Sequence, residues 1–132
     1  VSLTVRTQAA KGLRAADRGG TSDPYAVLHL QGAKNWERKT KTLFKTINPV
    51  WGEDFSVTCL LGQALEKPLT IAIFDDDVVS ADDLLGTARL DLTSILGPFC
   101  TTGGQGYKLK LPVTIGKGRK AAPPTAGKPI AP

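Results

Sequence analysis

Residues 73–86 read IFDDDVVSADDLLG and place five aspartates within nine positions, between Asp75 and Asp83. Apolar, β-rich runs flank this acidic segment at residues 69–74 and 84–90. Because like charges at such spacing repel one another, a fold that gathers them commonly binds a compensating cation. Carboxylate oxygens without a neighbouring histidine or cysteine favour calcium. For an arbitrary acidic run, the alternative is a solvated loop.

A second acidic loop lies upstream and favours the metal site. Asp17 and Asp23 stand six residues apart, directly after the first strand-like run. Gly19 and Gly20 between them let the chain curl, so that backbone carbonyls can also face a metal. Loops at the same end of a β-sandwich can meet. We therefore expect five carboxylates to converge on one cation site: Asp17, Asp23, Asp75, Asp77 and Asp83.

The fold class that the patterning predicts is all-β, an antiparallel Greek-key β-sandwich. Short runs of alternating apolar and polar residues recur along the chain with turn residues between them, and no long amphipathic helix is evident. The clear strands number seven: 1–7, 25–30, 37–43, 54–60, 69–74, 84–90 and 107–111.

The segments between and after these strands are predicted from composition. Residues 46–52 are expected to form a turn and residues 62–67 a connector, while His29 is expected to be a surface residue of its strand. From residue 116 the chain consists mainly of Gly, Lys, Ala and Pro. Residues 116–132 are therefore interpreted as a linker or a weak final strand, which leaves an eighth strand open.

The net charge of +5 conceals two regions of opposite sign. Seven of the twelve acidic residues lie in the two acidic loops, so the rest of the chain is strongly basic. A basic surface of this kind favours an anionic partner, either a membrane surface or a nucleic acid. Nucleic acid is disfavoured because no aromatic residues are interleaved with the basic strand and because the acidic loops would repel it.

Cysteine content and hydropathy limit the class of protein further. Cys59 and Cys100 provide neither a disulfide framework nor a zinc site, and they favour a reducing compartment. No run of about eighteen apolar residues and no leader segment is evident in the sequence. We therefore expect a cytoplasmic module.

Five separated motifs occur in the order of a known family. They are DRGGTSDPY at 17–25, KTKT at 39–42, NPVW at 48–51, FDDD at 74–77 and DLLG at 83–86. Through these motifs the chain resembles the C2 domains of conventional protein kinase C and synaptotagmin. The resemblance implies an eight-stranded sandwich over residues 1–115. Because the first strand leads directly into the Asp17 loop, it is closer to the circularly permuted C2 topology, whose final strand would come from the tail.

The resemblance also implies a site for two or three calcium ions. The ligand carboxylates of the family fall on the five aspartates named above. Further oxygens would come from the backbone carbonyls of Arg18 and Asp76 and from Ser80. Asp82, next to a ligand, is expected to face solvent. Asp76 departs from the aromatic or apolar residue that often separates the two ligand aspartates in the family.

The function implied by the resemblance is calcium-dependent binding to anionic phospholipid such as phosphatidylserine. On this interpretation the domain is recruited peripherally to membranes when calcium rises. Val78 and Val79, at the predicted tip of their loop, are expected either to enter the lipid interface or to pack back onto the sandwich.

A second lipid site is implied by the KTKT segment, which resembles a phosphoinositide-binding strand of the family. Lys39 and Lys41 are expected on one face of that strand, with Tyr25 and Trp51 beside them. The alternative for these lysines is a solvated strand face without a ligand.

The main alternative function is a calcium-independent protein-interaction module that uses the basic face. An enzyme is not expected, although residues 75–77 resemble the metal-holding Asp-x-Asp of nucleotide-sugar transferases. The chain is too short for that fold, and it lacks a phosphate-cradling glycine loop and a nucleophilic Ser/His or Cys/His pair. As an isolated domain it is expected to be a monomer.

Overall fold

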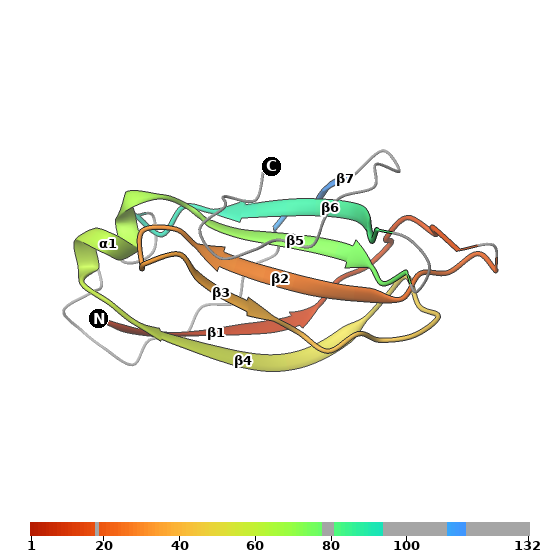
Figure 1. Ribbon diagram of the computed structural model, residues 1–132, viewed down its shortest axis with the longest axis horizontal. Coiled ribbons are helices and arrows are strands. Elements are labelled where there is room, and N and C mark those ends of the chain that lie inside the picture. The colour runs from red at the N-terminus through yellow and green to blue at the C-terminus, as the bar shows by residue number, and fades with distance from the viewer. Residues whose placement is uncertain (18, 78–80, 94–110, 116–132) are drawn as a thin grey trace.

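The computed structural model describes residues 1–17, 19–77, 81–93 and 111–115. Its strands form two antiparallel sheets that lie one above the other (Figure 1). The prediction of an antiparallel β-sandwich is confirmed. Within the described residues, no helix has the length and apolar character needed to cross a membrane.

The larger sheet has five strands in the order β3-β2-β5-β6-β7. They are β2 (Pro24–Leu30), β3 (Trp36–Lys39), β5 (Leu69–Asp75), β6 (Asp83–Leu90) and β7 (Thr114–Ile115). The central strands β2 and β5 are rich in β-branched and large apolar residues, as strands buried on both faces commonly are. Their antiparallel pairing sets Pro24 opposite Asp75. The start of β2 and the end of β5 therefore meet at one end of the sheet.

The smaller sheet pairs β1 (Ser2–Ala9) with β4 (Val50–Thr58). In β1 half-buried and exposed residues alternate, because successive side chains of a strand point to opposite faces. Leu3 lies opposite Val57 and Val5 lies opposite Phe55, which turns the apolar side chains of both strands toward the larger sheet.

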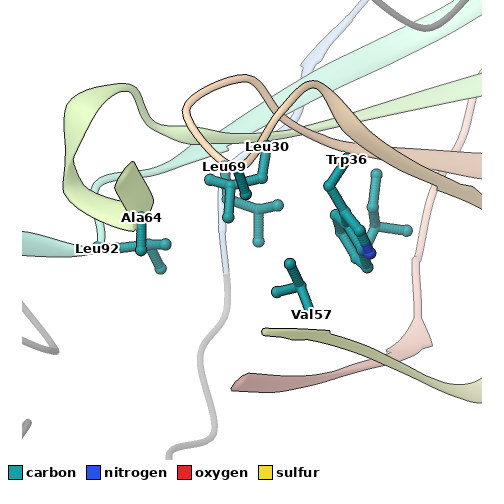
Figure 2. Packing of buried hydrophobic residues seen from close by; sticks show 8 residues of the cluster. Leu30, Trp36, Val57, Ala64, Leu69 and Leu92 are labelled. Carbon is teal, nitrogen blue, oxygen red and sulfur yellow. The ribbon is translucent and has the colours of Figure 1, made fainter. Parts of the chain in front are cut away.

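An apolar cluster between the sheets holds the sandwich together. Figure 2 shows Val57 rising from β4 toward Leu30 and Leu69 of the larger sheet. The short helix α1 (Leu61–Glu66) closes one end, where Ala64 lies against Leu92. Burying one leucine side chain contributes about 1.5–3 kcal/mol, so a cluster of this size is the main source of the free energy of folding.

Two segments between strands differ from the sequence prediction. The predicted turn at 46–52 is wrong at its end, because β4 already begins at Val50. Gly52 has a positive φ of 62° and lies opposite a register irregularity of β1, so it serves a bulge inside the strand. The predicted connector at 62–67 is mostly helix α1, whose entry is capped by the Leu60 N–H donating to Gln63 Oε1 at 3.0 Å.

Two residue predictions on β2 and β3 are also wrong. His29 is buried rather than exposed, because β2 lies between β3 and β5. Lys41 lies beyond the strand, since β3 ends at Lys39. The Thr40 hydroxyl accepts the N–H of Ala26 at 2.9 Å, where a regular ladder would supply a backbone carbonyl. Because a side-chain hydroxyl replaces the backbone carbonyl as acceptor, the regular β2–β3 ladder ends at this point.

The C-terminal predictions fall mostly outside the described residues. This applies to residues 107–110 of the last predicted strand and to the linker at 116–132. β7 at Thr114–Ile115 is a strand that was not predicted from the sequence. The domain limits and the permuted topology stay predictions.

Candidate functional site

The candidate site lies where three connecting segments meet at one end of the sandwich, opposite α1 (right in Figure 1). These segments are the loop after β1, the loop that joins β3 to β4, and the chain that leaves β5. Loops at the end of a rigid sandwich are positioned by the strands that they connect. The sheets therefore determine the geometry of the site.

Three of the five predicted ligands come together there. Ligand oxygens of Asp17, Asp23 and Asp75 all lie within 4.8 Å of one another. Asp75 is the last residue of β5 and is 1% exposed, whereas Asp23 is half-buried and Asp17 is exposed. The group is therefore open toward solvent on the side of Asp17 and closed toward the sheet.

Backbone hydrogen bonds hold two of these residues in register. The Asp23 N–H donates to Asp75 Oδ1 at 2.7 Å, and the Asp76 N–H donates to the Asp23 carbonyl at 2.9 Å. The second bond continues the β2–β5 ladder past the last strand residues, whereas the first joins the backbone of Asp23 to the side chain of Asp75. The two carboxylates are neighbours because the ladder of the sheet places them so.

The loop that carries Asp17 is folded on itself by Ser22, which is fully buried. The Ser22 hydroxyl donates to the Arg14 carbonyl at 2.7 Å and accepts the Ala16 N–H at 2.9 Å. The Asp17 N–H donates to the Thr21 carbonyl at 2.9 Å, and Gly20 between them has a φ of +80° that favours glycine. These contacts return Asp17 toward β2.

The loop between β3 and β4 is a part of the site that the sequence did not predict. The Lys45 N–H donates to Asp23 Oδ1 at 2.7 Å, and the Thr42 hydroxyl donates to Asp76 Oδ2 at 3.3 Å. A backbone donor carries no signature in the sequence. The positive φ of 55° at Lys45, which aims this N–H, has no sequence signal either.

The electrostatics of the group are unfavourable in the absence of a cation. Burial is the largest cause that raises the pKa of Asp75, from 3.8 to about 6. The N–H of Asp23 lowers this pKa in part, whereas the carboxylates of Asp17 and Asp23 raise it further. A cation among these oxygens would remove the repulsion, so the residues present fit a hard divalent metal such as calcium.

The remaining predicted ligands are placed less completely. Asp77 and Asp83 are half-buried, and Asp83 pairs with Asp75 across β5 and β6. Asp76 follows Asp75 directly, with its side chain at the Thr42 hydroxyl. Arg18, Val78, Val79 and Ser80 lie outside the described residues. The full ligand set stays a prediction.

The prediction that Asp82 faces solvent is wrong. Asp82 is 9% exposed, and its carboxylate accepts the Tyr25 hydroxyl and, at Oδ1, the Asp77 N–H at 2.9 Å. Burial raises the pKa of Tyr25 well above its usual range, and Asp82 raises it further, so the hydroxyl stays a donor. Asp82 therefore fastens the acidic segment to β2.

Of the residues predicted to bind lipid at or beside the basic strand, Lys39 and Tyr25 are in contact, and the four range from buried to exposed. Lys39 Nζ stands 4.2 Å from the centre of the Tyr25 ring, a cation–π contact. Tyr25 is only 1% exposed, which leaves no surface of its ring for a lipid headgroup. Lys41 is exposed, and half-buried Trp51 donates from Nε1 to the Pro24 carbonyl at 3.3 Å. The cation–π contact with the Tyr25 ring thus restrains the ammonium group of Lys39.

A family model of the C2 domain matches residues 1–108. The chain is 40% identical over 93 residues to multiple C2 and transmembrane domain-containing protein 1 of Homo sapiens, and 38% identical over 94 residues to cytosolic phospholipase A2 delta of Homo sapiens. It is 40% identical over 95 residues to synaptotagmin 1 of Drosophila melanogaster. These matches cover 70%, 71% and 71% of this chain but only 9%, 11% and 20% of those proteins.

Solved structures agree with this family. A C2 domain of RIM from Drosophila superimposes with a TM-score of 0.61 at 29% identity, covering 70% of this chain and 75% of that one. A C2 domain of plant extended synaptotagmin 1 gives a TM-score of 0.63 at 28% identity, covering 70% of this chain and 69% of that one. Human GIVD cytosolic phospholipase A2 gives 0.62 at 37% identity, with 72% of this chain and 12% of that enzyme covered.

We predict that Asp75→Asn stabilises the metal-free protein at pH 7. Asparagine keeps the acceptor for the Asp23 N–H and removes a buried charge. Since the folded pKa of about 6 lies above the 3.8 of the ordinary group, the wild type carries the full penalty above pH 6 and none below 3.8. Urea unfolding with a chelator should show a gain of about 3 kcal/mol or less at pH 7 that shrinks toward pH 4. A loss of stability at pH 7 would contradict the assigned repulsion.

We also predict that Tyr25 and Asp82 are energetically coupled. Tyr25→Phe leaves a buried carboxylate short of one donor and should cost about 1–3 kcal/mol of unfolding free energy. The same change should cost less in an Asp82→Asn background, because the buried charge is gone. A double-mutant cycle by urea unfolding measures this, and additive effects would show that the hydroxyl does not hold Asp82.

Proposed function

This chain belongs to the C2 domain family, and we propose that it is a calcium-dependent module that binds anionic phospholipid membranes through its acidic loops. The observation that supports the proposal is the group of Asp17, Asp23 and Asp75, whose ligand oxygens lie within 4.8 Å of one another. The C2 domain is a non-catalytic module, and the match to cytosolic phospholipase A2 delta covers 11% of that enzyme. We therefore propose no catalytic role for this chain.

Calcium would be held by oxygen atoms alone, as this ion prefers. Asp17, Asp23 and Asp75 would form the first part of the site, and Asp77 and Asp83 would extend it to two or three ions. Backbone carbonyls of Arg18 and Asp76 and the oxygen of Ser80 complete the proposed ligand set. When bound, calcium supplies positive charge and open coordination positions for a phosphate or carboxylate oxygen of phosphatidylserine.

The protein's own charges explain why binding would be switchable. Without metal, the clustered carboxylates repel an anionic bilayer, although the rest of the chain is basic and the net charge is +5. Once these carboxylates are neutralised, they no longer counteract the attraction of the basic residues to an anionic bilayer. Each Lys or Arg near such a surface adds about 1 kcal/mol to the binding free energy. Such a switch would need little backbone movement at Asp23 and Asp75, because hydrogen bonds at the end of the β2–β5 pairing already hold these two residues. Peripheral recruitment from the cytoplasm follows from this proposal.

A second proposed site, for a phosphoinositide headgroup, lies on the basic strand. Arg38, Lys39 and Lys41 are exposed within four residues, and the ring of Tyr25 restrains Lys39. A restrained ammonium loses less side-chain entropy when it binds a phosphate. This observation favours a defined anion site over a merely solvated face.

Vesicle sedimentation tests the calcium switch. The wild type should bind vesicles of phosphatidylserine and phosphatidylcholine with calcium, and should release with chelator or from pure phosphatidylcholine. Asp23→Asn/Asp75→Asn should lose this binding, because two ligands are removed. Asp54→Asn makes a single acidic-to-neutral change outside the acidic loops, at the exposed Arg6–Asp54 pair, and should bind normally. Equal binding in chelator would overturn the proposal, and no binding in any condition would favour the protein-interaction alternative.

Addition of a phosphoinositide to the same vesicles tests the basic-strand site. Lys39→Gln/Lys41→Gln should abolish the extra affinity that the phosphoinositide confers. Lys34→Gln/Lys67→Gln, which removes two exposed charges near α1, is the matched control and should retain most of it. An equal loss in both variants would mean that only net charge matters.

A further inference from the structure

We propose that Phe44, on the loop between β3 and β4, inserts into the membrane interface next to the metal site, while Lys41 and Lys45 contact anionic headgroups. The inference rests on the proposed function and adds an apolar anchor to it. It also places the anchor on a different loop from Val78 and Val79.

Phe44 is the most exposed aromatic side chain of the described residues, with 71% of its surface accessible. Its neighbour Leu43 is half-buried, and Ile47 packs against the core, whereas Phe44 belongs to none of the apolar clusters. A single exposed apolar residue is ordinary in itself. Its position and its surroundings are what point to a partner.

The position of Phe44 is set by the residues around it. The Leu43 N–H donates to the Pro24 carbonyl at 3.0 Å, and the Thr46 N–H donates to the Ser22 carbonyl at 2.8 Å. The Lys45 N–H donates to Asp23 Oδ1 at 2.7 Å. Phe44 therefore lies on a loop tied on both sides to the segment that bears Asp23, at the end of the sandwich that the acidic group occupies (Figure 1).

The charge around Phe44 selects an anionic, partly apolar partner. Residues 38–52 contain Arg38, Lys39, Lys41 and Lys45 and no aspartate or glutamate. Glu53, the next residue, accepts the Lys41 N–H at 2.9 Å through Oε2, so residues 38–53 carry four basic residues and one acidic residue and are basic on balance. An aromatic ring between lysines matches the boundary of an anionic bilayer, where the ring enters the acyl region and the ammonium groups remain among the headgroups.

Neutralisation of the acidic group would allow this contact. The Asp23 carboxylate belongs to the metal group and also accepts the N–H of Lys45, the residue that follows Phe44 in the chain. While the carboxylates are charged and without a bound cation, they keep the whole end of the molecule away from anionic lipid. Once this repulsion is removed, Phe44 can reach the interface without a rearrangement of the loop.

Affinity for vesicles of phosphatidylserine and phosphatidylcholine in calcium tests the inference. Phe44→Ala should weaken binding about tenfold, which corresponds to about 1.4 kcal/mol and to partial burial of the ring. Leu60→Ala is the matched control, because Leu60 is 72% exposed but precedes α1 at the opposite end. It should bind like the wild type. Thermal unfolding of both variants should match the wild type, since neither side chain is buried.

Insertion is measured directly with Phe44→Trp. The fluorescence of this tryptophan should shift to the blue on binding and should be quenched by lipids brominated in the acyl chain. Trp36 and Trp51 give the background, which is recorded on the wild type. Absence of extra quenching, together with unchanged affinity of Phe44→Ala, would overturn the inference.

The two levels of the proposal fail in different ways. If the wild type does not bind anionic vesicles in the presence of calcium, the proposed function is wrong. If the wild type binds and Phe44→Ala binds equally well, only the anchor is wrong. If Leu60→Ala weakens binding as much as Phe44→Ala, the effect is one of general surface hydrophobicity and the anchor is also wrong.

Discussion

Asp23 and Asp75 stand side by side because β2 begins where β5 ends, and the pairing of Pro24 with Asp75 fixes their separation. The N–H of Asp23, just beyond this last pair of the ladder, donates to the side-chain Oδ1 of Asp75. Burial raises the pKa of Asp75, and repulsion from the carboxylates of Asp17 and Asp23 raises it further. The sandwich core must offset this cost, and the clustered leucines and Trp36 between the sheets provide the free energy to do so.

The acidic group and the basic strand are physically connected. Lys39 lies over the ring of Tyr25, the Tyr25 hydroxyl donates to Asp82, and Asp82 accepts the N–H of Asp77. A displacement of the acidic segment would therefore move the side chain of Tyr25, and through it Lys39 on the basic strand. Hydrogen bonds to a buried carboxylate are among the stronger ones in proteins, so this connection is stiff. The two proposed lipid sites consequently share a support, although they differ in charge chemistry.

The sequence predicted strands and family better than burial. Alternation and apolar, β-rich runs located β1, β2, β5 and β6 within a few residues, and the ordered motifs indicated the C2 family, which the comparisons confirm. The predictions that His29 is a surface residue and that Asp82, next to a ligand, faces solvent were both wrong, because both side chains are buried. Burial depends on which neighbours cover a residue, and those neighbours are distant in the chain. The predicted turn at 46–52 was wrong at its end because glycine occurs in β-bulges as well as in turns, and Gly52 lies in a bulge of β4.

Residue chemistry and local periodicity were readable from the chain alone: oxygen ligands in two loops, a basic body, and short strands that alternate apolar and polar faces. The packed sheets alone decided that Asp17, Asp23 and Asp75 share one small volume, that a backbone N–H of a third loop binds Asp23, and that Tyr25 lies beneath Lys39. The physical reason is the distance over which each kind of interaction acts. Periodicity and turn preference act between near neighbours in sequence, whereas charge repulsion and hydrogen bonding act over a few ångströms in space. Asp23 and Asp75, 52 positions apart, become neighbours only through the pairing of β2 with β5.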